Sequence, residues 1–172
     1  MRTHYLQQLS ELEDLIGKMA GLIVGGFDEV AASLTKKNVA AVKDAANMEQ
    51  RTDKKLDEIE WLCSLLLLTQ QPVASDMRFI VSVMNVVVDM ERIGDQIRDI
   101  AETAAKCKKL PDDEEIAVMC ECCSFMIKGA LESYIGRDVD GARRVEARDD
   151  KVDAAFDSLQ IKLSERIKTT AD

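Results

Sequence analysis

The stretch VVVDMERIGDQIRDIAE, from Val86 to Glu102, combines the apolar density of a buried helix with a row of acidic residues. Its apolar residues recur three or four positions apart, the spacing that places them on one face of an α-helix. Glu91, Asp95 and Asp99 follow one another at intervals of four, so they stack along another face. Carboxylates at this spacing repel each other and destabilise an isolated helix. The pattern predicts a helix with a core face and an acidic ladder.

We expect the core face of this helix to be one apolar stripe, which contains Val83, Val86, Met90, Ile93, Ile97, Ile100 and Ala104. On a helical wheel, Glu91 and Asp95 lie roughly 140° to 180° from the centre of that stripe. Ile80, Met84 and Val87 share their azimuth a turn or two earlier. The helix is therefore apolar on two faces in its first half, and the second of these faces then becomes acidic.

Helical periodicity extends over almost the whole chain and predicts an all-α fold. The composition agrees, because 47% of the 172 residues are hydrophobic, only 4% are aromatic, and there are only two prolines and eight glycines. We expect five helices: the first ends near 35–38, and the next three cover about 39–69, 75–108 and 112–134. The fifth follows a GRDVDG turn at 136–141. Ser75 or Asp76 is the expected N-cap of the third helix.

The charge and the apolar runs argue against several classes of function. The formal charge of −9 argues against nucleic acid as a partner, because phosphate binding needs clustered Lys and Arg. The N-terminal residues become charged before the apolar stretch of a secretory signal can form. The runs WLCSLLLL and FIVSVMNVVV are too short to span a bilayer. We expect a soluble, cytoplasmic protein without membrane insertion.

The five cysteines and the single histidine do not indicate a zinc site. Cys120, Cys122 and Cys123 are clustered, but no second group of Cys or His completes a ligand set. We interpret the cysteines as reduced residues that act as small hydrophobes. His4 is expected to be exposed to solvent. A ferritin-like di-iron oxidase is set aside, because it would need Glu-x-x-His pairs on two helices.

The sequence contains an internal repeat. DKKLDEIEWL at 53–62 aligns with DDKVDAAFDSL at 149–159, which pairs Asp53 with Asp149 and Asp57 with Asp153. By this alignment the chain is a helix triplet followed by the first two helices of another triplet. We expect the third helix of the second triplet to be absent.

A second acidic ladder precedes the QQPVAS turn and contains Glu49, Asp53, Asp57 and Glu60. Antiparallel packing through this short turn brings it opposite Glu91 and Asp95. Such a cluster needs positive charge, and on spacing alone the favoured source is surface ion pairs with Arg51, Lys54, Lys55, Arg92 and Arg98. A metal ion is the alternative, since ligation by oxygen alone suits Mg, Ca, Mn or Fe.

The segment ERIGDQIRDIAE at 91–102, preceded by QQPVASDMRFI at 70–80, resembles the signature of the PhoU family. The resemblance implies tandem three-helix bundles, with a first repeat at 1–108 and a second, two-helix repeat at 109–172. It also implies a cytoplasmic, non-enzymatic negative regulator of inorganic phosphate uptake and signalling. Such a regulator would act as an adaptor between a phosphate ABC transporter ATPase and a phosphate-responsive sensor kinase.

The same resemblance implies a metal cluster of iron or zinc, with Mn, Mg and Ca as alternatives. The implied ligands are Glu91, Asp95, Asp53, Asp57, Asp149 and Asp153. The chain departs from the family pattern at Asp99, where many members have Asn. The expected absence of the last helix would leave the second metal site half-built.

That absence would also uncover apolar residues of the fifth helix, namely Val152, Phe156, Leu159 and Leu163. Because a large exposed apolar face favours association, we predict a homo-oligomer. Two alternative functions remain open from the residues. One is a helical-bundle enzyme with a carboxylate-bound metal. The other is a plain structural module whose acidic faces are only solvated.

Overall fold

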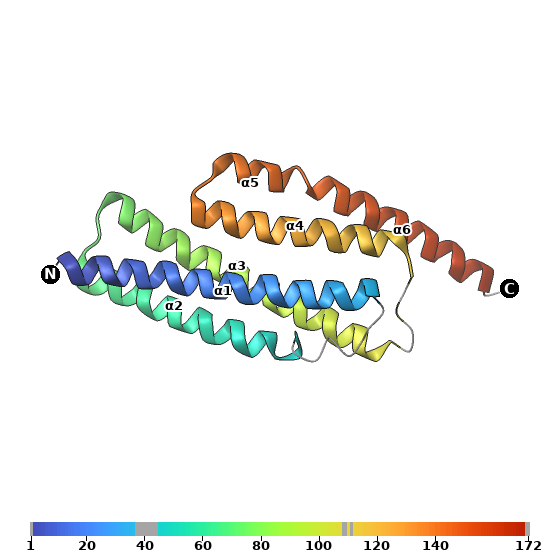
Figure 1. Ribbon diagram of the computed structural model, residues 1–172, viewed down its shortest axis with the longest axis horizontal. Helices are drawn as coiled ribbons and strands as arrows, with labels where there is room; N and C mark the ends of the chain where they lie inside the picture. Colours follow the sequence, from blue (N-terminus) through green and yellow to red (C-terminus); the bar gives the residue numbers. More distant parts are fainter. Residues whose placement is uncertain (1, 37–44, 108–109, 111, 171–172) are drawn as a thin grey trace. The chain divides into compact units, whose positions relative to one another are not determined.

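The computed structural model describes residues 2–36, 45–107, 110 and 112–170, and all regular structure in these ranges is helical (Figure 1). The elements are α1 Arg2–Lys36, the 3-10 turn η2 Ala45–Asn47, α2 Met48–Gln70, α3 Ala74–Lys106, α4 Glu114–Gly136, α5 Val139–Glu146 and α6 Asp149–Thr170. No helix in these ranges combines the length and apolarity that crossing a bilayer requires. The prediction of an all-α fold is confirmed.

The end of α1 and the boundaries of α3 and α4 agree with the predictions to within two residues, whereas α2 begins at Met48, after the turn η2. The part of the predicted second helix before residue 45 lies outside the described residues. The predicted N-cap of α3 is wrong, because Ser75 and Asp76 lie inside its first turn. The backbone N–H of Asp76 donates to the Val73 carbonyl, and its side chain accepts a 2.8 Å hydrogen bond from Tyr5 Oη.

The predicted fifth helix is two helices, α5 and α6, which corrects the expectation of one continuous element. Asp138, within the predicted turn, caps α5 by accepting the Gly141 N–H at 2.9 Å. The chain then turns at Ala147 and Arg148, whose N–H groups bond back to the carbonyls of Arg143 and Val145. Neither turn residue is Gly or Pro, the residues that usually mark the end of a helix in a sequence, so this break could not be predicted.

The chain packs as two compact units. Unit 1 comprises Met1–Gly26 and Lys43–Glu102, and unit 2 comprises Phe27–Val42 and Thr103–Asp172. Helices α1 and α3 thus contribute residues to both units. The predicted repeats at 1–108 and 109–172 rest on sequence similarity, and their boundaries differ from those of the two packed units. They stay a prediction.

Helix α3 buries a stripe with alternating spacings of three and four, made in unit 1 of Ile80, Val83, Val87, Met90, Gly94, Ile97 and Ala101. The predicted stripe is therefore half right. Val86 and Ile93 are only half-buried, and Ile100 is 36% exposed. A reading based on large apolar residues missed Gly94 and Ala101, which occupy core positions because they are small.

Gly94 marks a close approach between α2 and α3. A Cβ atom at this position would lie 2.6 Å from Thr52 Oγ1 and 2.7 Å from its Cγ2. Thr52 is itself buried on α2, and its hydroxyl donates to the carbonyl of Met48 at 3.0 Å. This contact brings the backbones of the two helices that carry the acidic ladders close together.

In unit 2, α4 packs against both α5 and α6. Gly129 permits the approach of α5, because a Cβ there would lie 2.7 Å from Val145 Cγ2. On α6 only Ala155 is buried among the apolar residues, and Val152 and Leu159 are half-buried. Two other large apolar residues of the predicted uncovered face, Phe156 and Leu163, are 55% and 43% exposed.

Candidate functional site

The acidic ladders of α2 and α3 meet in unit 1. The pKa of Glu91 is raised above its usual 4.5, first by burial and then by the negative charge of Asp95. Asp53 and Glu49 on α2 raise it further through their charges, and a hydrogen bond with Asp95 also favours the protonated form. The prediction that the two helices present carboxylates to one region is confirmed for these four residues, which we call the acidic cluster.

The acidic cluster lies beside the core face of α3. The helical wheel of the sequence predicts it on the opposite side of the helix, and that prediction is wrong. Because the observed stripe includes Val87 and Gly94, Glu91 lies only about 70° and Asp95 about 110° from its centre on an ideal helix. This position explains why Glu91 and Asp95 are half-buried rather than fully solvated. Burial weakens solvent screening and strengthens the repulsion between the carboxylates.

Arg98 neutralises one end of the cluster. Its guanidinium pairs with Glu49, donates to Asp99 Oδ1 at 2.8 Å and lies 3.9 Å from Asp95 Oδ1. Glu49, and after it Asp99, raise the pKa of Arg98. Ion pairing, the favoured interpretation on spacing alone, thus applies to Glu49 and Asp99 and, at a longer distance, to Asp95.

Asp95 keeps an unsatisfied oxygen. Its Oδ1 is shielded from solvent and has no hydrogen-bond partner among the described residues. A buried acceptor without a partner costs stability. The Asp95 carboxylate also raises the pKa of Glu91. A positive charge next to Asp95 would both satisfy its Oδ1 and lower the pKa of Glu91. The cluster therefore has the chemistry of a cation site.

The predicted ligands do not converge on one point. Within the part of the chain that the structure describes, no three His, Cys, Asp or Glu side chains are arranged to hold a metal ion. Asp57 lies one turn beyond Asp53 on α2 and is exposed. Asp149 and Asp153 are exposed on α6. A shared ion in unit 1 would therefore require rotation of the carboxylate side chains.

Three thiols, that of Cys63 on α2 and those of Cys120 and Cys123 on α4, are poorly suited to nucleophilic chemistry. Burial raises the pKa of Cys63 to about 11 and also raises the pKa values of Cys120 and Cys123. The charge of Asp149 contributes to the shift at Cys123 after burial and Cys122. Thiols with raised pKa values stay protonated and react poorly as nucleophiles. They act as small apolar residues, as the sequence predicted.

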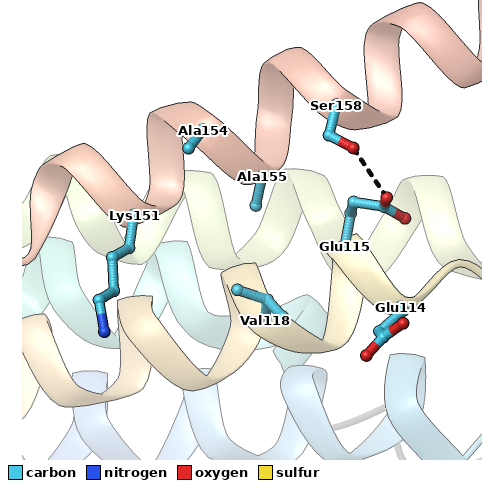
Figure 2. Close-up of a pocket in the computed structure, with 7 residues that line it drawn as sticks. All are labelled: Glu114, Glu115, Val118, Lys151, Ala154, Ala155 and Ser158. Atoms are coloured by element: carbon cyan, nitrogen blue, oxygen red, sulfur yellow. Dashed lines mark hydrogen bonds between the residues drawn. The ribbon is translucent and has the colours of Figure 1, made fainter.

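Sequence reasoning missed a pocket of about 340 Å³ between α4 and α6, which Figure 2 shows. The Glu115 carboxylate at one end accepts a 2.9 Å hydrogen bond from Ser158 Oγ and pairs with Lys162. Lys162, the backbone N–H of Glu115 and Ser158 lower the pKa of Glu115 to about 2. Nearby, Arg166 binds Asp113 with an Nη2–Oδ1 distance of 2.5 Å. These partners are 43 to 53 residues apart, so no local pattern could have revealed them.

The model of the family described as the PhoU domain matches residues 16–104 and 116–172. The chain belongs to the PhoU family. A PhoU homologue of Synechocystis, named a phosphate-specific transport system accessory protein, is 30% identical over 161 residues, which cover 92% of this chain and 72% of that protein. The Aquifex aeolicus homologue with the same name is 29% identical over 91% of this chain and 72% of its own.

Solved PhoU structures have the same fold. PhoU from Pseudomonas aeruginosa superposes with a TM-score of 0.88 at 22% identity, covering 96% of this chain and 81% of its own. The phosphate transport system regulatory protein PhoU from Streptococcus pneumoniae gives a TM-score of 0.86 at 22% identity, covering 96% and 79%. The predicted family and the predicted class of PhoU-like helical bundles, with the second bundle incomplete, are confirmed.

Proposed function

We propose that this chain is a non-enzymatic, cytoplasmic negative regulator of inorganic phosphate uptake and phosphate signalling. It acts as an adaptor between a phosphate ABC transporter ATPase and a phosphate-responsive sensor kinase. The observation that carries the proposal is the match, over 92% of the chain, to a relative named as an accessory protein of phosphate-specific transport. The chemistry of the site agrees, because the pKa values of the Cys63, Cys120 and Cys123 thiols are raised and the carboxylates of the acidic cluster are half-buried or exposed.

The experiment is a binding titration of the purified chain against the purified ATPase and the cytoplasmic part of the kinase, at high and low phosphate. We expect saturable binding to at least one of them, with an affinity that changes with phosphate. If neither partner binds at micromolar concentrations under either condition, the adaptor role is wrong. A helical protein of similar size and charge serves as the control for non-specific association.

We further propose that carboxylates of unit 1 bind metal, namely Glu91, Asp95, Asp53 and Asp57. The Oδ1 of Asp95, which has no hydrogen-bond partner among the described residues, and the raised pKa of Glu91 support a cation in this place. Donors that are all carboxylate oxygens suit Mg, Ca, Mn or Fe, and the family resemblance favours iron or zinc. A bound ion would supply the positive charge that the cluster lacks. The side chains would hold it after rotating towards each other.

On α6, Asp149 and Asp153 repeat the spacing of Asp53 and Asp57, and we propose a second cation site there on that spacing alone. Elemental analysis of untagged protein tests both sites. Loss of bound iron, zinc or manganese in Glu91→Gln/Asp95→Asn, with retention in Asp149→Asn/Asp153→Asn, would place the metal in unit 1. Metal at background level in the wild-type protein, with no thermal stabilisation by added cations, would contradict the proposal.

We also propose that the chain forms a homo-oligomer through the apolar face of α6. Phe156 and Leu163 are 55% and 43% exposed, and Ile167 is 70% exposed on the same helix. Sedimentation velocity tests this, with Phe156→Ser/Leu163→Ser as the variant and Val118→Ser as a control at an exposed valine of α4. A wild-type protein that sediments as a monomer at all concentrations would contradict it.

A further inference from the structure

A second face of α3 in unit 1 is apolar at one end and acidic at the other. We call it the α3 strip, and it contains Met77, Val81, Met84, Val88, Glu91 and Asp95. On an ideal helix these residues fall within an arc of about 80°, and the strip is about 27 Å long. In the apolar half, Met77 and Val81 are each 43% exposed and Val88 is 41% exposed.

Exposed apolar residues in a continuous row differ from the scattered ones that any surface carries. Met77, Val81, Met84 and Val88 follow each other at spacings of four, three and four, which is the spacing of a packing face, and all but the half-buried Met84 are exposed. The core stripe of α3 is a separate row that begins at Ile80 and is fully buried there. Helix α3 therefore carries one partnered face and one unpartnered face.

The acidic half of the strip favours a partner with positively charged side chains. Glu91 and Asp95 continue the strip, and Asp53 and Glu49 of α2 lie beside them. Arg98 pairs with Glu49 and Asp99 and lies 3.9 Å from Asp95 Oδ1, which has no hydrogen-bond partner among the described residues. The carboxylates are also spread along the helices instead of converging on one point in the described residues. A row of spaced carboxylates complements a row of spaced Lys or Arg side chains.

We propose that the α3 strip docks an amphipathic helix of a partner protein, with apolar residues along one half and Lys or Arg along the other half of the same face. A straight strip of this length matches a helix of about 18 residues. This inference deepens the proposed adaptor role and rests on it. Any divalent cation at Glu91 and Asp95 would compete with the partner's basic residues for the same carboxylates.

A second copy of this chain fits the strip less well. The basic residues near the apolar face of α6 are Lys162 and Arg166, and they are already paired with Glu115 and Asp113. A membrane surface is also a poor match, because anionic headgroups would be repelled by the acidic half and by the net charge of −9. The basic amphipathic helix satisfies both halves of the strip together.

The first test is a fluorescence anisotropy titration in chelator with two synthetic 18-residue helical peptides. One has Leu along one half of a face and Lys along the other half, and the second has the same composition with Leu and Lys interleaved. We expect the segregated peptide to bind at least tenfold more tightly. Equal affinities would overturn the proposal.

Variants locate the binding. Val81→Ser/Val88→Ser should lower the affinity for the segregated peptide at least fivefold and leave the salt dependence of that affinity unchanged. Asp53→Asn/Asp95→Asn should instead make the affinity less dependent on salt. The controls are Val118→Ser and Val139→Ser, at valines of unit 2 that are 38% and 65% exposed. All changed side chains are partly or fully exposed, and circular dichroism verifies folding. Equal weakening by the controls would overturn the proposal.

The same variants are then tested against the transporter ATPase and the sensor kinase. If a partner binds the wild-type chain and loses affinity in Val81→Ser/Val88→Ser, the strip is its docking site. If binding is unchanged, the strip proposal is wrong while the adaptor role stands. If neither protein binds the wild-type chain, the adaptor role is wrong, and the peptide titration alone decides whether the strip binds a basic helix. A dimer that dissociates only in this variant would identify a second copy as the occupant and overturn the proposal.

Discussion

Glu91 in unit 1 and Glu115 in unit 2 are both shielded glutamates on helices that pack in pairs, yet their surroundings have opposite signs. Glu91 faces other carboxylates, and its pKa is raised by burial and by Asp95. Glu115 faces Lys162 and Ser158, and its pKa is lowered to about 2. The difference separates an ion-paired carboxylate that joins two helices, Glu115, from a carboxylate whose nearest charges are negative, Glu91. Only the latter is suited to bind an external cation.

The gathering of carboxylates around Glu91 depends on Gly94, which permits the close approach of α2 and α3. We expect Gly94→Ala to destabilise the protein by about 1–2 kcal/mol, because overpacking against Thr52 outweighs the higher helix propensity of Ala. Gly25→Ala is the matched control, since its Cβ would meet nothing within 4 Å and should stabilise by about 0.5–1 kcal/mol. Thermal and urea denaturation measure both. Equal effects of the two substitutions would show that the helices are not in close contact at Gly94.

The next largest effect is expected at the ion pair of unit 2. Glu115→Gln removes the charge that Lys162 and Ser158 stabilise, so the melting temperature at pH 7 should fall by a few degrees. Because the folded pKa is depressed, this contribution is present above the usual 4.5 and is lost as the pH falls towards about 2. The difference in melting temperature between wild type and variant should therefore shrink below pH 4. A difference that does not change with pH would contradict the ion pair.

The smallest effect is expected at Glu91, and its sign is opposite. A raised folded pKa means that the folded state binds the proton more tightly, so stability falls as the pH rises from 4.5 through the folded pKa. Glu91→Gln removes that penalty and should raise the melting temperature at pH 7 by roughly 1 °C at low salt. The gain should disappear at pH 4. A lower melting temperature at pH 7 would mean that Glu91 makes a favourable contact that the account lacks.

Much of unit 1 could be predicted because its signals are local. The period of the apolar residues identified α3, and the short turn at Pro72 implied that α2 returns beside it, which placed Asp53 near Glu91. The exact register could not be predicted, since Gly94 and Ala101 carry no hydrophobic signal although they occupy the packing stripe. That error shifted the acidic cluster from the flank of the core to the opposite side.

Unit 2 was less predictable because its interactions connect distant residues. The pairs of Glu115 with Lys162 and of Asp113 with Arg166 depend on the register of α4 against α6, which no spacing within one helix specifies. The break between α5 and α6 falls on Ala147 and Arg148, two residues with good helix propensity. The sequence therefore predicted the carboxylates that gather along α2 and α3 more readily than the ion pair between Glu115 and Lys162.

Side-chain carboxyl NMR titration of the wild-type protein tests the central claim most directly, because one experiment reports on both glutamates. We expect a pKa above 4.5 for Glu91, decreasing in Asp95→Asn, and a pKa near 2 for Glu115. Two values close to 4.5, or a pKa of Glu91 that does not respond to Asp95→Asn, would contradict the claim that Glu91 lies among carboxylates while Glu115 is ion-paired.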